Sequence, residues 1–177
     1  LLGRIESNSQ ISDCFSSCEV NGSANSGGLI GYLNSSSAVN CHTTGSVNGS
    51  QAATGGLIGQ SNRSQVIICS SSAVVIGAGY CGGLIGYLIS NWESSPSTVT
   101  QCYFSGTVSG FGDVGGLVGY TTNYTSVTDS YNSGSVTGTA AVGGGIGFVQ
   151  SSTITNCYSY GAVTGEESTG GLIGLNT

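Results

Sequence analysis

A five-residue motif, Gly-Gly-Leu followed by Ile or Val and a further Gly, recurs with small variations along the whole chain. Counted from the leucine position, successive copies are 27 or 28 residues apart, except for one spacing of 33 residues. A fixed period in this range is typical of solenoids, in which each repeat buries its apolar face only against its neighbours. The period therefore predicts a single repeat domain over residues 1–177. The six copies span residues 27–31, 55–59, 82–86, 115–119, 143–147 and 170–174.

Three positions in each repeat, one of them the second apolar residue of the glycine-rich motif, are apolar, mostly β-branched, and bounded by Gly, Asn or Ser. Such segments predict short strands rather than helices. If each repeat forms one coil, strands of successive coils pair in parallel about 4.8 Å apart. We expect an all-β parallel β-solenoid of about six coils, with three short strands per coil; a β-sandwich or prism is the alternative. The columns are Ile11, Val39, Val66, Val99, Val127 and Ile154; then Val20, Val47, Val75, Val108, Val136 and Val163; and then Leu2, Ile30, Ile58, Ile85, Val118, Ile146 and Ile173.

The low charge of the chain excludes several kinds of partner. Only 6% of the residues are charged, the net charge is -6, and Arg4 and Arg63 are the only cationic side chains. Nucleic acids and anionic membrane surfaces are bound largely through Lys and Arg, so neither is an expected partner. No apolar run approaches the roughly 18 residues of a membrane span, which predicts no membrane insertion. The regular apolar columns also argue against disorder, despite 32 glycines.

The repeat consensus resembles a known family. Gly-Gly-Leu-Ile-Gly-Tyr, then a Ser-rich stretch, Val-x-Asn-Cys-Tyr and Gly-x-Val-x-Gly, is similar to the GLUG-type repeats of bacterial and other microbial surface proteins. Proteins with such repeats include adhesin-like surface proteins and some secreted metallopeptidases that cleave IgA. The resemblance implies an extracellular or cell-surface location and a spacer or adhesive role, with no chemistry in the repeats themselves.

Few residues could support catalysis or hold a cofactor. The chain has one histidine, His42, and therefore no His-Glu-x-x-His metal site. Asp113, Glu166 and Glu167 share one predicted corner but lie two coils apart. The Gly-x-Gly-x-x-Gly matches at 77–82 and 110–115 lead into strands, whereas dinucleotide binding needs a helix there. We expect no enzymatic activity, no metal and no cofactor.

One column of the repeat is usually cysteine. Stacked coils bring neighbouring Cα atoms within the 4.4–6.8 Å that a disulfide allows, although small buried thiols also pack well in the reduced form. We expect a reduced thiol ladder, with disulfides between adjacent coils as the alternative. The column holds Cys14, Cys41, Cys69, Cys102, Ser130 and Cys157.

The 33-residue spacing places an insertion near residues 89–97, with the only Trp and the only Pro. A long corner loop projects from a solenoid without disturbing its coils, so Trp92 and Glu93 are the predicted contact site. Glycosylation sequons, which matter only if the source glycosylates its proteins, are further candidate modification sites. They begin at Asn21, Asn34, Asn48, Asn62 and Asn123.

The leucine of the glycine-rich motif precedes an inward-facing column. Strict alternation along a strand would point these leucines outward and form an apolar stripe. Exposed stripes usually mark interfaces, so we expect self-association, lateral or end to end. The alternative is that a corner lets both columns point inward. The stripe consists of Leu1, Leu29, Leu57, Leu84, Leu117 and Leu172.

These features favour an extracellular structural or adhesive repeat protein, and a filament or surface-fibre subunit is one form that such a protein takes. A carbohydrate-binding surface module is one alternative, because two columns are rich in aromatic residues that could stack on sugars, although mutual packing is the more economical explanation. A glycan or a surface protein would then be the partner. An ice-binding solenoid is the other alternative, supported by outward Thr and Ser pairs in only three coils. The aromatic columns are Tyr103, Tyr131 and Tyr158, and Tyr32, Tyr87, Tyr120 and Phe148.

Overall fold

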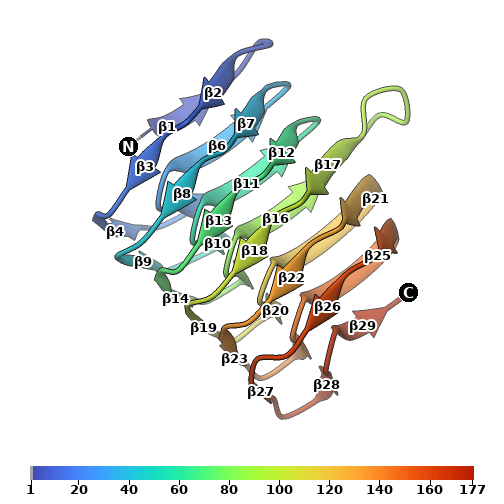
Figure 1. Cartoon of the computed structure of the whole chain (residues 1–177). Coiled ribbons are helices and arrows are strands. Elements are labelled where there is room, and N and C mark those ends of the chain that lie inside the picture. The colour runs from blue at the N-terminus through green and yellow to red at the C-terminus, as the bar shows by residue number, and fades with distance from the viewer. Residues whose placement is uncertain (1) are drawn as a thin grey trace.

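Every strand pairing in the structure is parallel and joins residues of one coil to the equivalent residues of the next. The computed structural model describes residues 2–177, which form six stacked coils (Figure 1). The predicted parallel β-solenoid is confirmed. The three predicted strands of each coil are present, and two further strands of two or three residues complete the coil.

The strands form four sheets. The largest has 11 strands and makes two walls of the solenoid. One wall holds β1 (Leu2–Ile5), β6 (Ile30–Asn34), β11 (Ile58–Asn62), β16 (Ile85–Ile89), β21 (Val118–Thr128), β25 (Ile146–Thr155) and β29 (Ile173–Asn176). The other wall holds β2 (Gln10–Ser12), β7 (Ser37–Val39), β12 (Gln65–Ile67) and β17 (Ser97–Thr100). The two walls are joined because the long strands β21 and β25 continue across the corner between them.

Three six-stranded sheets form the remaining walls. The first holds β3 (Phe15–Ser16), β8 (His42–Thr43), β13 (Ser70–Ser71), β18 (Tyr103–Phe104), β22 (Tyr131–Asn132) and β26 (Tyr158–Ser159). The second holds β4 (Glu19–Gly22), β9 (Ser46–Gly49), β14 (Val74–Gly77), β19 (Thr107–Gly110), β23 (Ser135–Thr137) and β27 (Val163–Thr164). The third holds β5 (Ser26–Gly27), β10 (Ala53–Gly55), β15 (Tyr80–Gly82), β20 (Val114–Gly115), β24 (Ala141–Gly143) and β28 (Ser168–Gly170).

The predicted apolar columns form the core with one correction. The valine column from Val20 to Val163 and the column from Leu2 to Ile173 pair in the predicted register. In the remaining column, Val39 was assigned wrongly. Ala38 pairs with Ile11 and Val66 and is fully buried, while Val39 faces outward beside Ile67. The sequence favoured Val39 because its β-branched side chain matched the column, but register is set by position relative to Cys41.

The prediction that the motif leucines face outward is wrong. Leu29, Leu57, Leu84 and Leu117 are at most 1% exposed and belong to the core. The backbone turns at this point, because the carbonyl of Leu57 accepts hydrogen bonds from the amides of both Leu29 and Ile30. Strict alternation fails at such a corner, so both columns point inward. Leu172 is half-buried in the last coil, and Leu1 lies outside the described residues.

The paired glycines are required by the close approach of neighbouring backbone and side-chain atoms rather than by a special backbone conformation. A Cβ on Gly83 would lie 2.3 Å from Cδ1 of Phe104, which is the largest fully buried side chain. In the equivalent position of the last coil, a Cβ on Gly171 would meet nothing within 4 Å. A Cβ on Gly83 would also lie 2.3 Å from the carbonyl oxygen of Gly116 in the next coil. The second glycine of each pair therefore makes room for the backbone of the next coil and, at Gly83, also for the inward ring of Phe104.

A left-handed backbone residue precedes the cysteine column in every coil, with φ between 49° and 55°. Asn and Asp adopt this conformation readily and are frequent here. Asn40 donates a hydrogen bond to Asp13, and Asn156 donates one to Asp129, so these residues also link coils. Ile68, with φ 54°, is the β-branched exception and is 49% exposed. The column is Asp13, Asn40, Ile68, Gln101, Asp129 and Asn156.

The irregular spacing is taken up by one loop. Residues 90–96 lie between β16 and β17 and project beyond the other corners of the solenoid (Figure 1). Ser90 anchors the base of the loop. Its buried hydroxyl shares its one hydrogen between the carbonyls of Trp92 and Ser95 and accepts a hydrogen bond from the amide of Trp92. Ser97 closes the base by donating to the carbonyl of Ile89 at 2.6 Å. The coils on either side remain continuous.

Candidate binding surface

The first aromatic column lies on the outer face of β18, β22 and β26. The rings of Tyr103 and Tyr131 are 5.3 Å apart and 7° from parallel, and those of Tyr131 and Tyr158 are 5.2 Å apart and 4° from parallel. Tyr160 extends the stack. The faces of the inner rings are therefore covered by neighbouring rings, and mainly ring edges reach the solvent.

The second aromatic column is a packed cluster on the first wall. Tyr120 lies between Tyr87 and Phe148, with ring centroids 5.3 and 4.9 Å away. Tyr80, from β15, stacks against Tyr120 at 4.8 Å. Burial raises the pKa of Tyr87 to about 12, and the neighbouring tyrosines add to this effect. Both columns thus stabilise the outer faces mainly by mutual packing, at about 0.5–1.5 kcal/mol per pair.

The first column has a gap at Ser70, which pairs with His42 on one side and Tyr103 on the other. His42 Nδ1 lies 2.7 Å from the Ser70 hydroxyl, and its Nε2 lies 3.2 Å from Asn40 Oδ1. A shallow hollow of about 330 Å³ opens beside these residues. His42 is therefore one member of an outer column, and it bonds Ser70 and Asn40 rather than the Cys41 thiol, which donates to the carbonyls of Ile11 and Val39.

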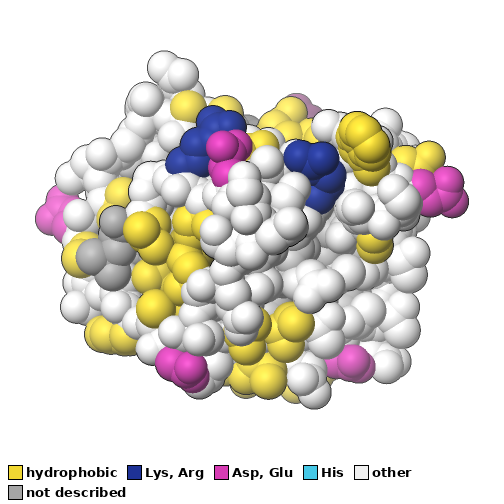
Figure 2. All heavy atoms as spheres, turned by 90° about the horizontal axis from the view of Figure 1, so that it is seen from above, with side chains coloured by type: hydrophobic (Ala, Val, Ile, Leu, Met, Phe, Trp, Pro, Cys, Tyr) yellow, Lys and Arg dark blue, Asp and Glu magenta, His cyan; other side chains and the backbone are white. Residues whose placement is uncertain are grey.

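Both arginines gather on one edge of the first wall. They are the only dark blue side chains in Figure 2, where they lie on the same face. Arg4 pairs with Glu6 and lies over the ring of Tyr32, with its guanidinium carbon 4.8 Å from the ring centroid. The ion pair raises the pKa of Arg4 and lowers that of Glu6. Both side chains are exposed to solvent, so this pair contributes little to stability.

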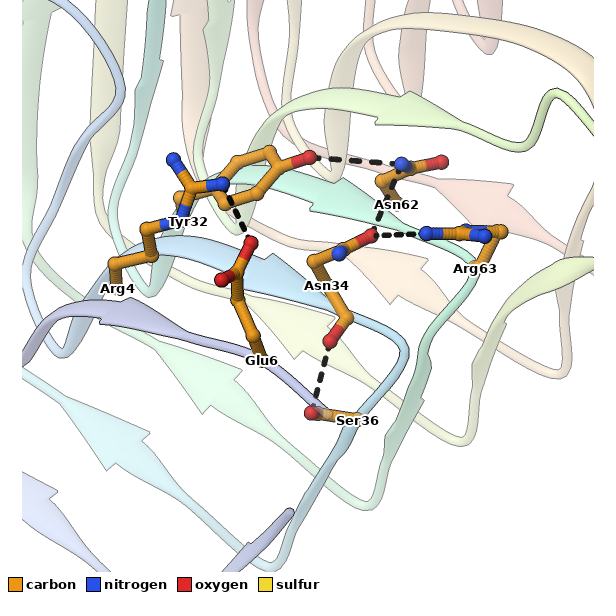
Figure 3. Close-up of polar contacts among 7 residues, drawn as sticks. All are labelled: Arg4, Glu6, Tyr32, Asn34, Ser36, Asn62 and Arg63. Carbon is orange, nitrogen blue, oxygen red and sulfur yellow. Dashed lines mark hydrogen bonds and ion pairs between the residues drawn. The ribbon is translucent and has the colours of Figure 1, made fainter. Parts of the chain in front are cut away.

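Arg63 stands at the corner where β11 leaves the first wall. Its Nη2 donates to Asn34 Oδ1 at 3.2 Å, and the Asn62 amide donates to the same oxygen at 3.1 Å (Figure 3). The Asn62 amide also contacts the Tyr32 hydroxyl at 3.5 Å. Among residues 2–177 the Arg4–Glu6 pair is the sole ion pair, so Arg63 has no carboxylate partner there.

The projecting loop brings Trp92 to this corner. The guanidinium carbon of Arg63 lies 5.8 Å from the centroid of the indole ring, within the range of a cation–π contact. Trp92 remains 61% exposed. The predicted contact residue therefore lies beside one of only two cations of the chain. Glu93, the other residue of the predicted contact site, is exposed on the same loop.

The cysteine column is a ladder of free thiols held by repeated hydrogen bonds. The amide of Cys41 donates to Cys69 Sγ at 3.4 Å, and the amide of Cys69 donates to Cys102 Sγ at 3.3 Å. The amide of Cys102 donates in the same way to Ser130 Oγ at 3.0 Å. Serine therefore replaces cysteine without loss of the contact. All seven cysteines are unbonded to one another, including Cys14 and Cys157 at the ends of the ladder.

No cluster of side chains suited to a metal ion is present in the described part of the chain. Residues 2–177 contain no group of three or more His, Cys, Asp or Glu side chains that could hold a metal ion. Burial raises the pKa of Asp113, whereas Glu166 and Glu167 are exposed. The two Gly-x-Gly-x-x-Gly segments run into β15 and β20, and no helix follows either one.

The sequon asparagines differ in their surroundings. Asn48 donates to Asn21 at 2.9 Å, and Asn62 donates to Asn34, so these four form amide pairs between coils. Asn123 is exposed at the irregularity of β21, with φ 53°. Attachment of a glycan to the amide nitrogens of Asn48 or Asn62 would replace a hydrogen bond, so Asn123 is the most compatible site. Glycosylation stays a prediction.

The outward threonine array is confined to three coils. Thr100 and Thr128 pair, with their hydroxyls 3.1 Å apart, and Thr128 pairs with Thr155. On the next coil toward the N-terminus the equivalent residues are Gln65 and Ile67. This interruption leaves an array too short to support the ice-binding alternative.

Comparison with known proteins agrees with this architecture. The family model described as "The GLUG motif" matches residues 112–137, so the chain carries this motif. No curated protein matches the chain. No helix among residues 2–177 has the length and apolar character needed to cross a membrane.

A solved structure shows the same fold at low sequence identity. It is a crystal structure from Bacteroides ovatus described as a "putative immunoglobulin A1 protease", with a TM-score of 0.62 and 21% identity. The match covers 98% of this chain and 66% of the other. At this identity the likeness establishes the β-helical architecture alone, and this chain spans about two thirds of that protein.

Proposed function

We propose that this chain is an adhesive segment of a secreted or surface protein, in which a rigid solenoid presents the Trp92 loop to a glycan. The observation that carries the proposal is the single projecting loop, which displays a largely exposed tryptophan from an otherwise regular stack. Large aromatic side chains in exposed loops are typical contact residues, because they offer a rigid apolar face at low entropic cost. The GLUG motif, which occurs in secreted surface proteins, supports the location.

The solenoid contributes stiffness and reach rather than chemistry. Continuous ladders of hydrogen bonds and apolar side chains connect every coil, so the loop is held at a fixed place on a long framework. With the leucine column buried, lateral assembly through a leucine stripe is no longer proposed. The aromatic columns support stability more than binding, since their rings pack against one another.

A glycan array with the whole chain tests the proposal. We expect binding that is lost in Trp92→Ala and kept in Phe111→Ala, which removes another exposed aromatic ring, 75% exposed, at a different corner. Circular dichroism should show that both variants keep the β-sheet signal. Equal binding by wild type and Trp92→Ala would contradict the proposal, and loss only in Tyr103→Ala would move the site to the hollow beside Ser70.

A further inference from the structure

From the corner around Arg63 we infer a site for a carboxylate-bearing sugar, in which Arg63 binds the carboxylate and Trp92 packs against the ring. This inference rests on the proposed adhesive function and adds the chemical class of its ligand. Its first support is charge. Arg63 is one of two cations in a chain with eight acidic residues, yet none of the acids in the described chain pairs with it.

The guanidinium is held in place without being neutralised. Asn34 accepts one hydrogen bond from Nη2, and the backbone at Arg63 adopts a left-handed conformation with φ 49°. The Nε atom is buried and has no hydrogen-bond partner in the protein. A guanidinium has five N–H donors in a planar fork that suits a carboxylate. A ligand cannot reach the buried Nε, so the N–H groups of Nη1 and Nη2 that Asn34 leaves unused are the donors for a carboxylate.

A polar hollow adjoins the guanidinium. It measures about 280 Å³ and is lined by Arg63 together with Ser35, Ser37 and Gln65. The side chains of these three neighbours make no hydrogen bond to the rest of the described chain, so they can serve the hydroxyl groups of a ligand. This volume is slightly below the roughly 300–1,000 Å³ of pockets for small molecules, so the hollow takes at most a single sugar ring rather than a long chain.

Trp92 supplies the apolar half of the site. The Arg63 guanidinium lies over its ring, which is otherwise largely open to solvent. Trp92 does not itself line the hollow and is joined to it through Arg63. The C–H face of a pyranose is apolar and packs on such a ring, while the hydroxyls on its rim need hydrogen-bond partners. Aromatic face, hydroxyl-rich hollow and guanidinium together match a uronic or sialic acid better than a neutral sugar or an unstructured acidic peptide.

The overall charge limits how acidic the ligand can be. With a net charge of -6, the protein repels highly charged polyanions, and a single unpaired arginine neutralises one negative group. A heavily sulfated polymer or a nucleic acid would need several cations in a row. Glu93, exposed next to Trp92, adds local negative charge that weakens the binding of any anion. The fitting ligand therefore carries one carboxylate.

Titration calorimetry with two acidic sugars and their neutral counterparts tests the inference. The probes are oligosaccharides ending in glucuronic acid or N-acetylneuraminic acid, and matched ones ending in glucose or galactose. We expect at least one acidic probe to bind the whole chain at least about tenfold more tightly than its neutral counterpart. The comparison between the two acids distinguishes uronate from sialate as the natural source of the carboxylate.

Variants assign the effect to Arg63. Arg63→Gln should weaken acidic-sugar binding about 10- to 100-fold, the range for a lost hydrogen bond to a charged group. Arg63→Lys should retain part of the affinity, because it keeps the charge but not the fork. Arg4→Gln is the matched control and should change affinity less than twofold, since Arg4 is already paired with Glu6. Glu93→Gln should strengthen acidic-sugar binding about twofold, because it removes a nearby negative charge. If the true ligand were a cation, the same substitution would weaken binding instead.

The outcomes separate this inference from the proposed function. Equal binding of acidic and neutral sugars, with loss in Trp92→Ala, would overturn the carboxylate site and leave the adhesive function standing. Unchanged affinity in Arg63→Gln, with its melting curve intact, would also overturn the site. Binding of a glutamate-rich peptide but of no sugar would overturn the sugar assignment. Absence of binding to every probe and to the glycan array would overturn both.

Discussion

Replacement of Leu57 by alanine tests the corner that turns the leucine column inward. Leu57 is fully buried in the third coil, with Leu29 and Leu84 in the coils on either side. The substitution removes three carbon atoms, which loses about 2.4 kcal/mol of transfer free energy at about 0.8 kcal/mol per carbon. Because the stacked backbones cannot close over the gap, the cavity raises the expected loss to about 3–5 kcal/mol.

Leu172→Ala is the matched control within the same column. Leu172 is half-buried in the last coil and faces Gly145 rather than another leucine. Only part of its transfer free energy is at stake, so we expect a loss of about 1 kcal/mol. The large difference between two identical substitutions depends on the inward orientation of the column and on the position of the coil, and not on residue type.

Urea unfolding followed by circular dichroism measures both losses. The midpoints are comparable as long as the slope of the transition stays constant between variants, which also checks that the coils unfold together. Light scattering on the same samples reports the state of association. One outcome would refute the inward corner. The Leu57→Ala variant would be as stable as the wild type but would fail to form an oligomer that the wild type forms, which would make the leucines surface contacts.

Three further predictions address the glycines, the strained turn and the thiols. Gly83→Ala should destabilise the fold by about 1–3 kcal/mol through overlap with both the Gly116 carbonyl and the Phe104 ring, whereas Gly171→Ala, where an added Cβ meets nothing, should be near neutral. Thermal melts compare the two variants, and equal effects would refute the packing argument. Ile68→Asn should raise the free energy of unfolding by about 1 kcal/mol, because Asn tolerates the left-handed backbone better than Ile. Ile76→Asn, at an equally exposed position within a strand, should bring no such gain. Chemical unfolding measures both variants, and a larger gain from Ile76→Asn would contradict the strain argument. Burial raises the pKa of Cys41 to about 11 and that of Cys81 to about 12. Because the thiols of the unfolded chain ionise at lower pH, the free energy of unfolding should fall between pH 9 and pH 12. Unfolding midpoints that fell no more than those of the double variant Cys41→Ser, Cys81→Ser would contradict this prediction.

Much of the fold follows from periodicity, because equivalent residues of stacked coils must be neighbours. The period fixed the number of coils, the parallel pairing and the register of two apolar columns. The third column shows the limit, since Val39 matched by residue type and Ala38 matched by position. The two short strands per coil were missed because segments of two or three residues carry no periodic signal.

The candidate site was only partly predictable. The irregular spacing identified the loop at residues 89–97 and the exposed Trp92, since an insertion in a regular repeat leaves a mark in the sequence. Arg63 was recognised as a rare cation but not as the neighbour of Trp92. One signal was available: equivalent corners of adjacent coils stack, and Arg63 begins the corner that precedes the insertion by one coil.

The sequence alone determined the period, the parallel β-solenoid and the position of its one large insertion, because these depend on repetition along the chain. Only the tertiary structure decided the direction of the motif leucines, since a bend at Leu29 and Leu57 overrides the alternation of a flat strand. It also decided that Arg63 meets Trp92, because the path of a projecting loop depends on the buried hydroxyls of Ser90 and Ser97 at its base. Periodicity sets which residues stack, and local backbone geometry sets where their side chains point.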